Sequence, residues 1–353
     1  MESMKPGKIV LLGSGETLPS SGKAHEYAAR QLPQPPTIAI LETPAGFELN
    51  AGRVAGKIKD FLEVRLTNYA PNIIQIPARK KGTDLSPDDP ELVAPLYHAD
   101  EILLGPGSPT YAVRQLGGSL AYEILKARIR MGAALVLSSA ATLAFGRKTI
   151  PVYEIYKVGE DLHWVDGLNL FGMYGLPLSV VPHWNNNDGG DDLDTSRCYI
   201  GEERFYALYD RLPKDEIFLG IDDHTSVAID LEERLCQVMG NGTVTLLKDG
   251  EETVFESGSE FDLNLIGTPV IPDPMDEIHP DVWQRALAEA EARAARAAEK
   301  QEPPGEVIDL LKARNAARQA NEWDRADSLR EEIEALGWQV NDTPEGPELV
   351  LLD

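Results

Sequence analysis

The first 270 residues alternate short, almost continuous apolar runs with helix-like stretches, and this alternation restricts the fold more than any other feature. Continuous apolar runs are typical of strands buried on both faces, as in a parallel sheet. Strands separated by helices predict a doubly wound α/β domain. The predicted strands are 8–13, 37–42, 72–77, 101–107, 134–140 and 179–183, with helices expected at 51–66 and 111–131.

The pattern changes twice towards the C-terminus. From about residue 216 the predicted strands are short and closely spaced, with hairpin-turn signals at Asn241-Gly242 and Asp249-Gly250, which predicts an antiparallel extension on one edge of the main sheet. A linker with a charged, Ala-rich helix follows at 273–305, after a main domain at 1–272. Residues 306–353 then predict a small, mainly helical domain with two amphipathic helices and a hairpin.

Composition excludes several classes of protein. The chain has 33 basic and 58 acidic residues, a net charge of −25, which is unfavourable for general nucleic-acid binding because that binding depends on neutralising phosphates. It contains no apolar run approaching the roughly 18 residues of a membrane span, and its start does not resemble a signal peptide. Cys198 and Cys236 provide neither a disulfide framework nor a tetrahedral zinc set. A soluble cytoplasmic protein without metal, cofactor or membrane contact is expected.

The segment 133–142, AALVLSSAAT, has the layout of a nucleophile elbow. A buried strand leads directly into Ser138 and Ser139, and then into small residues that begin a helix. Such a turn exposes a side chain at the carboxyl end of the sheet, and small neighbours let the helix pass close to the strand. The alternative interpretation is that a serine simply caps the helix.

Two further segments would meet the elbow at the same sheet edge. The loop 105–110, GPGSPT, would provide a backbone N–H for an oxyanion, or it is a plain turn in which Ser108 or Thr110 caps the next helix. His183 ends a buried strand, where it would deprotonate a serine on a neighbouring strand end, or it only packs there. His224 is the competing candidate. The polar loop that follows His183 does not fit a calcium-binding motif.

Taken in order, these segments resemble the dipeptidase E and cyanophycinase family of serine peptidases, which has the class I glutamine amidotransferase-like, flavodoxin-like fold. The resemblance covers about residues 6–258. It rests on VLLGSGE, LLGPGSPTYAVRQL, the elbow LSSAA, PHW at 182–184, GIDDHTS at 220–226 and VMGNGTV at 238–244.

The resemblance implies a role for individual residues. It makes Ser139 the nucleophile and His183 its general base, with Glu154 as the acidic residue that orients the histidine. Gly107 and Ala140 would donate backbone N–H groups to the oxyanion. Ser108 and Arg197 would contact the substrate, with Arg197 holding a carboxylate bidentately. The sequence departs from the family at Leu137 and Ala141, which replace both elbow glycines, and at Ser108, where asparagine is common. A side chain at Leu137 or Ala141 is expected to crowd the pocket.

The tail resembles a different family. Residues 306–350, above all LLKARNAARQANEWDRADSLREEIEALGWQVNDTPEGPEL, are similar to the small C-terminal domain of cysteinyl-tRNA synthetase, which lies near the tRNA anticodon. Residues 303–353 have five basic and twelve acidic residues, so tight binding of tRNA by the tail alone is not expected. The alternative is a helical module used for packing or dimerisation.

Two hypotheses follow. In the first, the chain is a serine hydrolase that cleaves a small peptide or an aspartyl-type peptide or isopeptide bond through Ser139, His183 and Glu154. In the second, the altered elbow has impaired catalysis, and the chain is a binding or regulatory protein whose tail contacts tRNA or a protein. The sequence leaves a homodimer open.

Overall fold

The computed structural model describes residues 5–273, 275–301, 303–343 and 346–352. Contacts divide the chain into two compact units, Met1–Ala286 and Leu287–Asp353. The division falls inside helix α7 (Pro280–Gln301), within the segment 273–305 that the sequence predicts as a linker. Val282, Trp283 and Ala286 on the first two turns of α7 are buried, so the helix begins as part of the first unit.

In the described part of the first unit, eight strands form the main sheet in the order β14-β11-β10-β1-β5-β4-β2-β3. The parallel part consists of β1 (Ile9–Leu12), β5 (Ala134–Ser138), β4 (Glu101–Leu104), β2 (Thr37–Leu41) and β3 (Asn72–Ile76). The antiparallel part consists of β10 (Thr225–Asp230), β11 (Leu235–Gly240) and β14 (Glu260–Asp262). The doubly wound α/β fold class predicted from the apolar runs is therefore confirmed.

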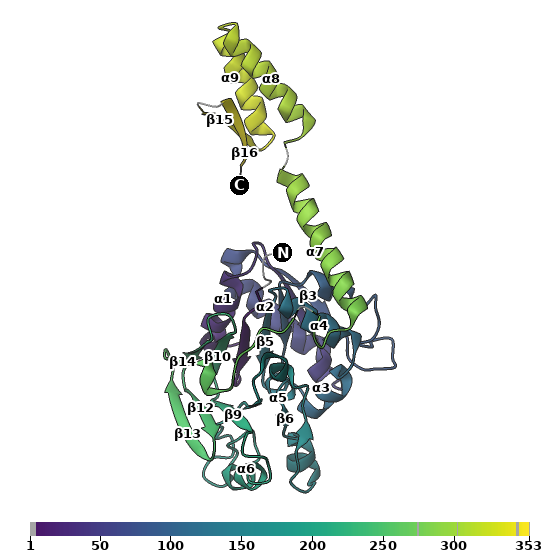
Figure 1. Ribbon diagram of the computed structural model, residues 1–353, viewed down its shortest axis with the longest axis vertical. Helices are drawn as coiled ribbons and strands as arrows, with labels where there is room; N and C mark the ends of the chain where they lie inside the picture. Colours follow the sequence, from purple (N-terminus) through teal and green to yellow (C-terminus); the bar gives the residue numbers. More distant parts are fainter. Residues whose placement is uncertain (1–4, 274, 302, 344–345, 353) are drawn as a thin grey trace. The chain divides into compact units, whose positions relative to one another are not determined.

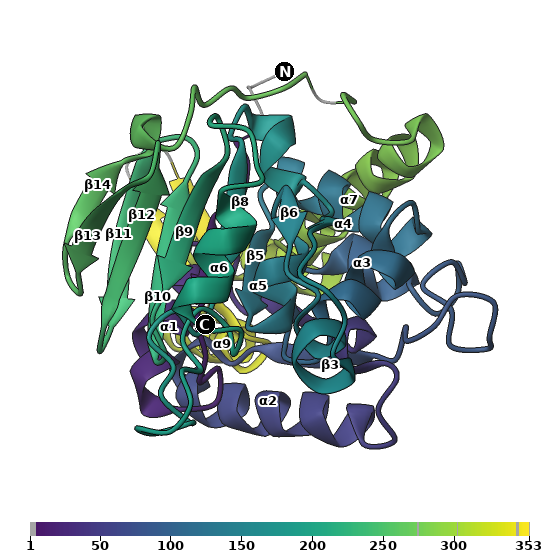
Figure 2. The ribbon, with the colours of Figure 1, turned by 90° about the horizontal axis from the view of Figure 1, so that it is seen from below.

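Helices cover both faces of the main sheet (Figure 2). On one face α1 (Gly22–Arg30) and α2 (Ala51–Arg65) pack on alternate strand residues such as Val10, Leu12 and Ile40, all buried. The other face carries α3 (Pro109–Leu116), α4 (Leu120–Arg130) and α5 (Ala140–Ala144). The predicted helix 111–131 is thus two helices, because Gly118 takes a positive φ of 68° and Ser119 caps α4 by accepting a hydrogen bond from Tyr122 N.

A second sheet departs from the prediction. The structure separates β13-β12-β9-β8 from the main sheet, whereas the sequence placed 179–183 among the main parallel strands. Its strands are β8 (Leu178–Val181), β9 (Ile217–Ile221), β12 (Thr243–Lys248) and β13 (Glu251–Glu256). The last three are labelled in Figure 1, and all four are labelled in Figure 2. Because β8 and β9 are parallel neighbours, the chain leaves both at the same edge. Helix α6 (Glu202–Tyr209) packs on this sheet through Phe205 and Leu208.

Smaller elements complete the first unit. They are the two-stranded pair β6 (Lys148–Thr149) and β7 (Val165–Asp166), a π-helix η5 (Glu154–Val158), and the 3-10 turns η1 (Pro19–Ser21), η2 (Thr43–Ala45), η3 (Thr67–Tyr69), η4 (Ala94–His98), η6 (Leu170–Tyr174) and η7 (Leu263–Leu265). None of the helices in the described residues is long and apolar enough to cross a membrane.

After the C-terminal part of α7, the second unit forms two helices and a hairpin, as the sequence predicts. The helices are α8 (Gly305–Gln319) and α9 (Trp323–Ala335), and the hairpin strands are β15 (Trp338–Thr343) and β16 (Gly346–Leu351). Val307, Ile333, Trp338 and Val340 form its small core. Arg314, only 3% exposed, donates two hydrogen bonds to Asp342, at 3.1 and 2.9 Å, and Arg318 pairs with the same carboxylate, so α8 is tied to the hairpin.

Candidate active site

Ser139 lies at a sharp turn between β5 and α5. Its backbone has φ 52° and ψ −114°, a conformation that an L-residue adopts only when its surroundings enforce it. The turn is held by buried neighbours on both sides and by the N–H of Ser139, which donates to Leu12 O at 3.3 Å. Such a strained turn points the Ser139 side chain away from the sheet, as in a nucleophile elbow.

The residues that replace the elbow glycines do not obstruct the site. Leu137 and Ala141 are both fully buried, and Leu137 pairs with Leu11 and Leu104 of the neighbouring strands. Neither residue lines the cavity that contains Ser139. The crowding that the sequence analysis expected is therefore absent among the described residues, because both side chains point into the core.

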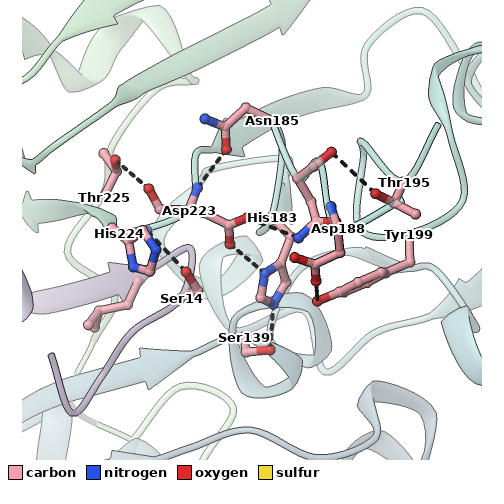
Figure 3. A network of polar contacts seen from close by, with 12 residues as sticks. Ser14, Ser139, His183, Asn185, Asp188, Thr195, Tyr199, Asp223, His224 and Thr225 are labelled. Carbon is pink, nitrogen blue, oxygen red and sulfur yellow. Dashed lines mark hydrogen bonds and ion pairs between the residues drawn. The ribbon is translucent and has the colours of Figure 1, made fainter. Parts of the chain in front are cut away.

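His183 follows β8 and contacts the serine directly. Its Nε2 lies 2.8 Å from Ser139 Oγ (Figure 3). The positive φ of 53° at His183 ends the strand, and its carbonyl accepts hydrogen bonds from Asn186 N and Cys198 N. The histidine side chain is only 12% exposed, so its ring has little freedom to leave the serine.

Asp223 completes the hydrogen-bonded chain. His183 Nδ1 donates to Asp223 Oδ1 at 2.7 Å (Figure 3). Asn186 Nδ2 donates to the other carboxylate oxygen at 3.1 Å. Burial alone would raise the pKa of Asp223, but hydrogen bonds from His183, Ser14 and Asn186 outweigh burial and lower it to about 2. A carboxylate that stays ionised holds the proton of the neutral imidazole on Nδ1, which leaves Nε2 free to accept the proton of Ser139.

The structure does not bring Glu154 to His183. Glu154 begins the π-helix η5, where Thr110 Oγ1 donates to its Oε1 at 2.6 Å, and its buried Oε2 has no hydrogen-bond partner in the described residues. Asp223 occupies the position expected for Glu154. The sequence contained a clue to the role of Asp223, because this residue belongs to the GIDDHTS stretch and follows a strand. Its position beside His183, however, depends on the pairing of β8 with β9.

Gly107 and Ala140 line the same cavity as Ser139 and His183. Ala140 is the first residue of α5, so its N–H has no partner within the helix. Gly107 has a φ of 151°, and a Cβ there would lie 2.0 Å from Pro44 O. Ser108 N donates to the same Pro44 carbonyl at 3.0 Å, which fixes the loop after β4. Both residues expected to donate to an oxyanion therefore line the cavity that contains Ser139.

The other predicted site residues have structural partners instead. Ser108 Oγ caps α3 by accepting from Tyr111 N at 3.2 Å, which is the capping alternative. Arg197 stacks on Trp184 with its guanidinium carbon 4.0 Å from the ring centroid, donates to Trp184 O and lies near Glu202 and Glu252. Neither Ser108 nor Arg197 lines the cavity. His224, the competing histidine, contacts Ser14 through its backbone N–H at 3.0 Å.

The cavity beside Ser139 has a volume of about 440 Å³. Its walls come from the loop after β4 and the start of α3, from α5, from η5 and the segment that leads into it, and from the segments around His183 and Tyr199. The described residues contain no group of three or more His, Cys, Asp or Glu side chains arranged for a metal ion. The polar atoms that converge on the cavity form an arrangement suited to nucleophilic attack on a carbonyl with acid–base assistance.

Comparison with known proteins finds separate matches for the two units. A solved peptidase from an acI-B1 Actinobacterium has the same fold, with a TM-score of 0.58 and 19% sequence identity over 74% of this chain and 98% of that chain. Residues 300–346 match the family model of the cysteinyl-tRNA ligase anticodon binding domain.

Curated relatives are found for the tail. The chain is 51% identical over 57 residues to the cysteine–tRNA ligase of Nitratidesulfovibrio vulgaris and 45% identical over 49 residues to that of Methanosarcina mazei. These matches cover 16% and 14% of this chain, and only 12% and 10% of the two ligases. The similarity therefore concerns one small domain that a larger enzyme and this chain have in common.

Proposed function

We propose that the first unit is a serine hydrolase that cleaves a small peptide or a related acyl compound. The observation that carries the proposal is the hydrogen-bonded chain from Ser139 through His183 to Asp223, with Ser139 and His183 on the wall of a cavity that Gly107 and Ala140 also line. The fold shared with a solved peptidase supports the proposal. Because Asp223 replaces Glu154 beside the histidine, the proposed triad is Ser-His-Asp.

In the proposed reaction, Ser139 Oγ attacks the substrate carbonyl carbon while His183 Nε2 accepts the hydroxyl proton. The N–H groups of Gly107 and Ala140 stabilise the negative charge on the carbonyl oxygen. His183 then donates the proton to the leaving nitrogen, the bond to that nitrogen breaks, and an acyl-enzyme remains. Water, deprotonated by His183, releases the acid and restores Ser139. Asp223 keeps the imidazole oriented and stabilises its cationic form throughout.

The test uses an organophosphonate that modifies only activated serines, followed by intact mass measurement and peptide mapping of the full-length protein. A single adduct on Ser139 is expected in the wild type and none in Ser139→Ala. Ser138→Ala is the matched control, because the adjacent Ser138 is fully buried and donates to Glu16 at 2.8 Å, so this variant should still form the adduct. An unmodified wild-type protein would contradict the proposal and favour the alternative of a catalytically impaired scaffold.

We propose as a second function that the tail contacts tRNA, because residues 300–346 match an anticodon binding domain. All five basic side chains of the tail are already paired with carboxylates of the tail, namely Lys312, Arg314, Arg318, Arg325 and Arg330 with Asp309, Asp342, Glu322 and Glu334. Few cations remain to neutralise phosphates, so the proposed contact is weak and depends on salt.

A gel-shift titration of the full-length protein with tRNA tests this second function. A shift is expected at about 25 mM salt and its loss at about 150 mM, because added salt weakens even a contact with few phosphates and a weak complex then no longer shifts. Arg325→Glu should weaken the shift, whereas Lys23→Glu, an exposed lysine of the first unit, makes the same charge change as a control. Equal effects of the two variants, or no shift at low salt, would count against a contact through the tail.

A further inference from the structure

The walls of the cavity next to Ser139 are mainly apolar and aromatic. The wall includes the buried side chains of Leu143 and Val152 and the rings of three tyrosines, Tyr153, Tyr156 and Tyr199. The Tyr156 and Tyr199 rings have centroids 6.2 Å apart, and the Tyr199 ring lies 5.4 Å from the His183 ring. An aromatic surface therefore extends from His183 to the π-helix η5.

The fixed charges on the described cavity wall cancel. They belong to Lys157 and Asp188, which carry opposite charges at neutral pH. Asp188 accepts a hydrogen bond from the Tyr199 hydroxyl at 3.1 Å, and the Lys157 ammonium lies 4.5 Å from the centroid of the Tyr156 ring. Both charged groups are thus engaged with the aromatic wall, and the wall has no excess of positive charge with which to hold an acidic side chain.

Arg197, the residue expected to bind a substrate carboxylate, is not available for that task. Its guanidinium stacks on Trp184 and lies 3.5 Å from Glu202 and 3.9 Å from Glu252. The side chain is 12% exposed and lies outside the cavity wall. The net charge of −25 adds a field that repels anions. An acidic substrate would therefore lose hydration and meet only Lys157, whose ammonium already lies against the Tyr156 ring and whose charge Asp188 offsets.

We infer that the site accepts substrates with an aromatic or large aliphatic side chain next to the scissile carbonyl, and discriminates against acidic ones. This inference rests on the proposed serine hydrolase function. The side chain would lie against Leu143, Val152 and the Tyr156 ring, where burial of apolar surface favours it. It differs from the aspartyl-type substrate that the family resemblance implies.

The test measures kcat/KM for N-acetylated 4-nitrophenyl esters of Phe, Leu, Asp and Lys, corrected for the rate of Ser139→Ala. The activated leaving group removes any dependence on the other side of the scissile bond. Titration with the organophosphonate first gives the concentration of active serine. The Phe and Leu esters are expected to exceed the Asp and Lys esters by about tenfold or more, the selectivity typical of an apolar pocket.

Variants of η5 locate the selectivity. Tyr156→Ala should lower the ratio of kcat/KM for the Phe ester to kcat/KM for an Ala ester about tenfold, because only the large side chain reaches the ring. Val158→Ala is the matched control, since Val158 belongs to the same π-helix, is 72% exposed and does not line the cavity. If Tyr156→Ala lowers the melting temperature, Tyr153→Ala serves instead, because Tyr153 is 39% exposed.

The possible failures are distinguishable. Equal rates for the four esters, or a preference for the Asp ester that Lys157→Gln removes, would overturn the inference and leave the hydrolase intact. Absence of the organophosphonate adduct on Ser139 would overturn the proposed function and the inference together.

Discussion

His183 and Asp223 are separated by forty positions in the chain, yet Nδ1 of the histidine donates to Oδ1 of the aspartate at 2.7 Å. The contact exists because β8 and β9 are adjacent and parallel, so that the residues following each strand meet at one edge. Ser139 reaches the same place from β5 in the main sheet. The candidate site is therefore assembled where the carboxyl ends of strands from two different sheets converge.

The first prediction concerns which acid orients the histidine. Asp223→Asn should lower kcat by about 10³- to 10⁴-fold, because an amide favours the wrong imidazole tautomer. Glu154→Gln is the matched control and should retain most of the activity, since Glu154 contacts Thr110 and not His183. Steady-state kinetics on the best ester substrate measure both. A larger loss in Glu154→Gln than in Asp223→Asn would show that the acid has been assigned incorrectly.

The second prediction concerns the oxyanion donors. Gly107→Ala should reduce kcat by about 10²- to 10³-fold, because a Cβ 2.0 Å from Pro44 O must displace the backbone that carries the donor. Gly118→Ala is the control, since Gly118 has a φ of 68° but a Cβ added there would meet no atom within 4 Å. Gly118→Ala should introduce only local backbone strain, which lowers the melting temperature and leaves kcat unchanged. Similar kcat values for both variants would argue against Gly107 as a donor.

The third prediction concerns the pH dependence of stability. Glu101 in β4 is fully buried, neither carboxyl oxygen has a hydrogen-bond partner in the described residues, and burial raises its pKa from 4.5 to about 8. The folded chain therefore keeps a proton that the unfolded chain releases above pH 4.5, so this residue's contribution to stability is full below pH 4.5 and is lost as the pH rises towards 8. The expected loss between pH 4 and pH 7 is roughly 3 kcal/mol.

Urea unfolding of wild type and Glu101→Gln between about pH 4 and pH 9 measures this effect. The neutral amide should make the free energy of unfolding less dependent on pH in that window. Glu91→Gln, at an exposed position, should leave the wild-type slope unchanged. If the free energy of unfolding changes with pH in the same way in wild type and in Glu101→Gln, Glu101 does not hold the proton in the folded chain.

The fourth prediction concerns the second unit. Arg314→Met removes a buried guanidinium and its two hydrogen bonds to Asp342, which should destabilise the helix–hairpin contact by about 2 kcal/mol. Hydrogen exchange in α8 and β15 of the full-length protein should accelerate accordingly. The Arg325 side chain is 68% exposed beside Glu322. Arg325→Met should therefore change the free energy of opening, measured by hydrogen exchange, by no more than about 0.5 kcal/mol. Equal protection in both variants would show that the Arg314 pair contributes little.

Much of the fold was predictable because its signals are local. The continuous apolar runs predict strands buried on both faces, and five of the six predicted strands are members of the main sheet. The sixth predicted strand, at 179–183, is also a continuous apolar run but belongs to the second sheet. An apolar run indicates that a strand is buried and does not indicate which strand it pairs with. The prediction of one helix at 111–131 was wrong at Gly118, although a glycine and a capping serine are local signals for a break.

The candidate site was only partly predictable for the same reason. Strand ends place Ser139 and His183 at a sheet edge, so their approach to 2.8 Å follows a pattern present in the sequence. The partner of His183 is not a property of local sequence, and the resemblance pointed to Glu154 while the structure brings Asp223. The resemblance implied that Arg197 binds a substrate carboxylate. In the structure Arg197 contacts Trp184, Glu202 and Glu252 instead, and these contacts hold it away from the cavity wall.

The sequence by itself determined the periodicity of strands and helices, the strained turn at Ser139 and the separate tail, because these depend on neighbours a few residues apart. The tertiary structure alone decided the order of the strands, the acid beside His183 and the aromatic wall around the cavity. The physical reason is that hydrogen bonds and packing act over a few ångströms in space, and which distant residues reach that range depends on how the two sheets are assembled.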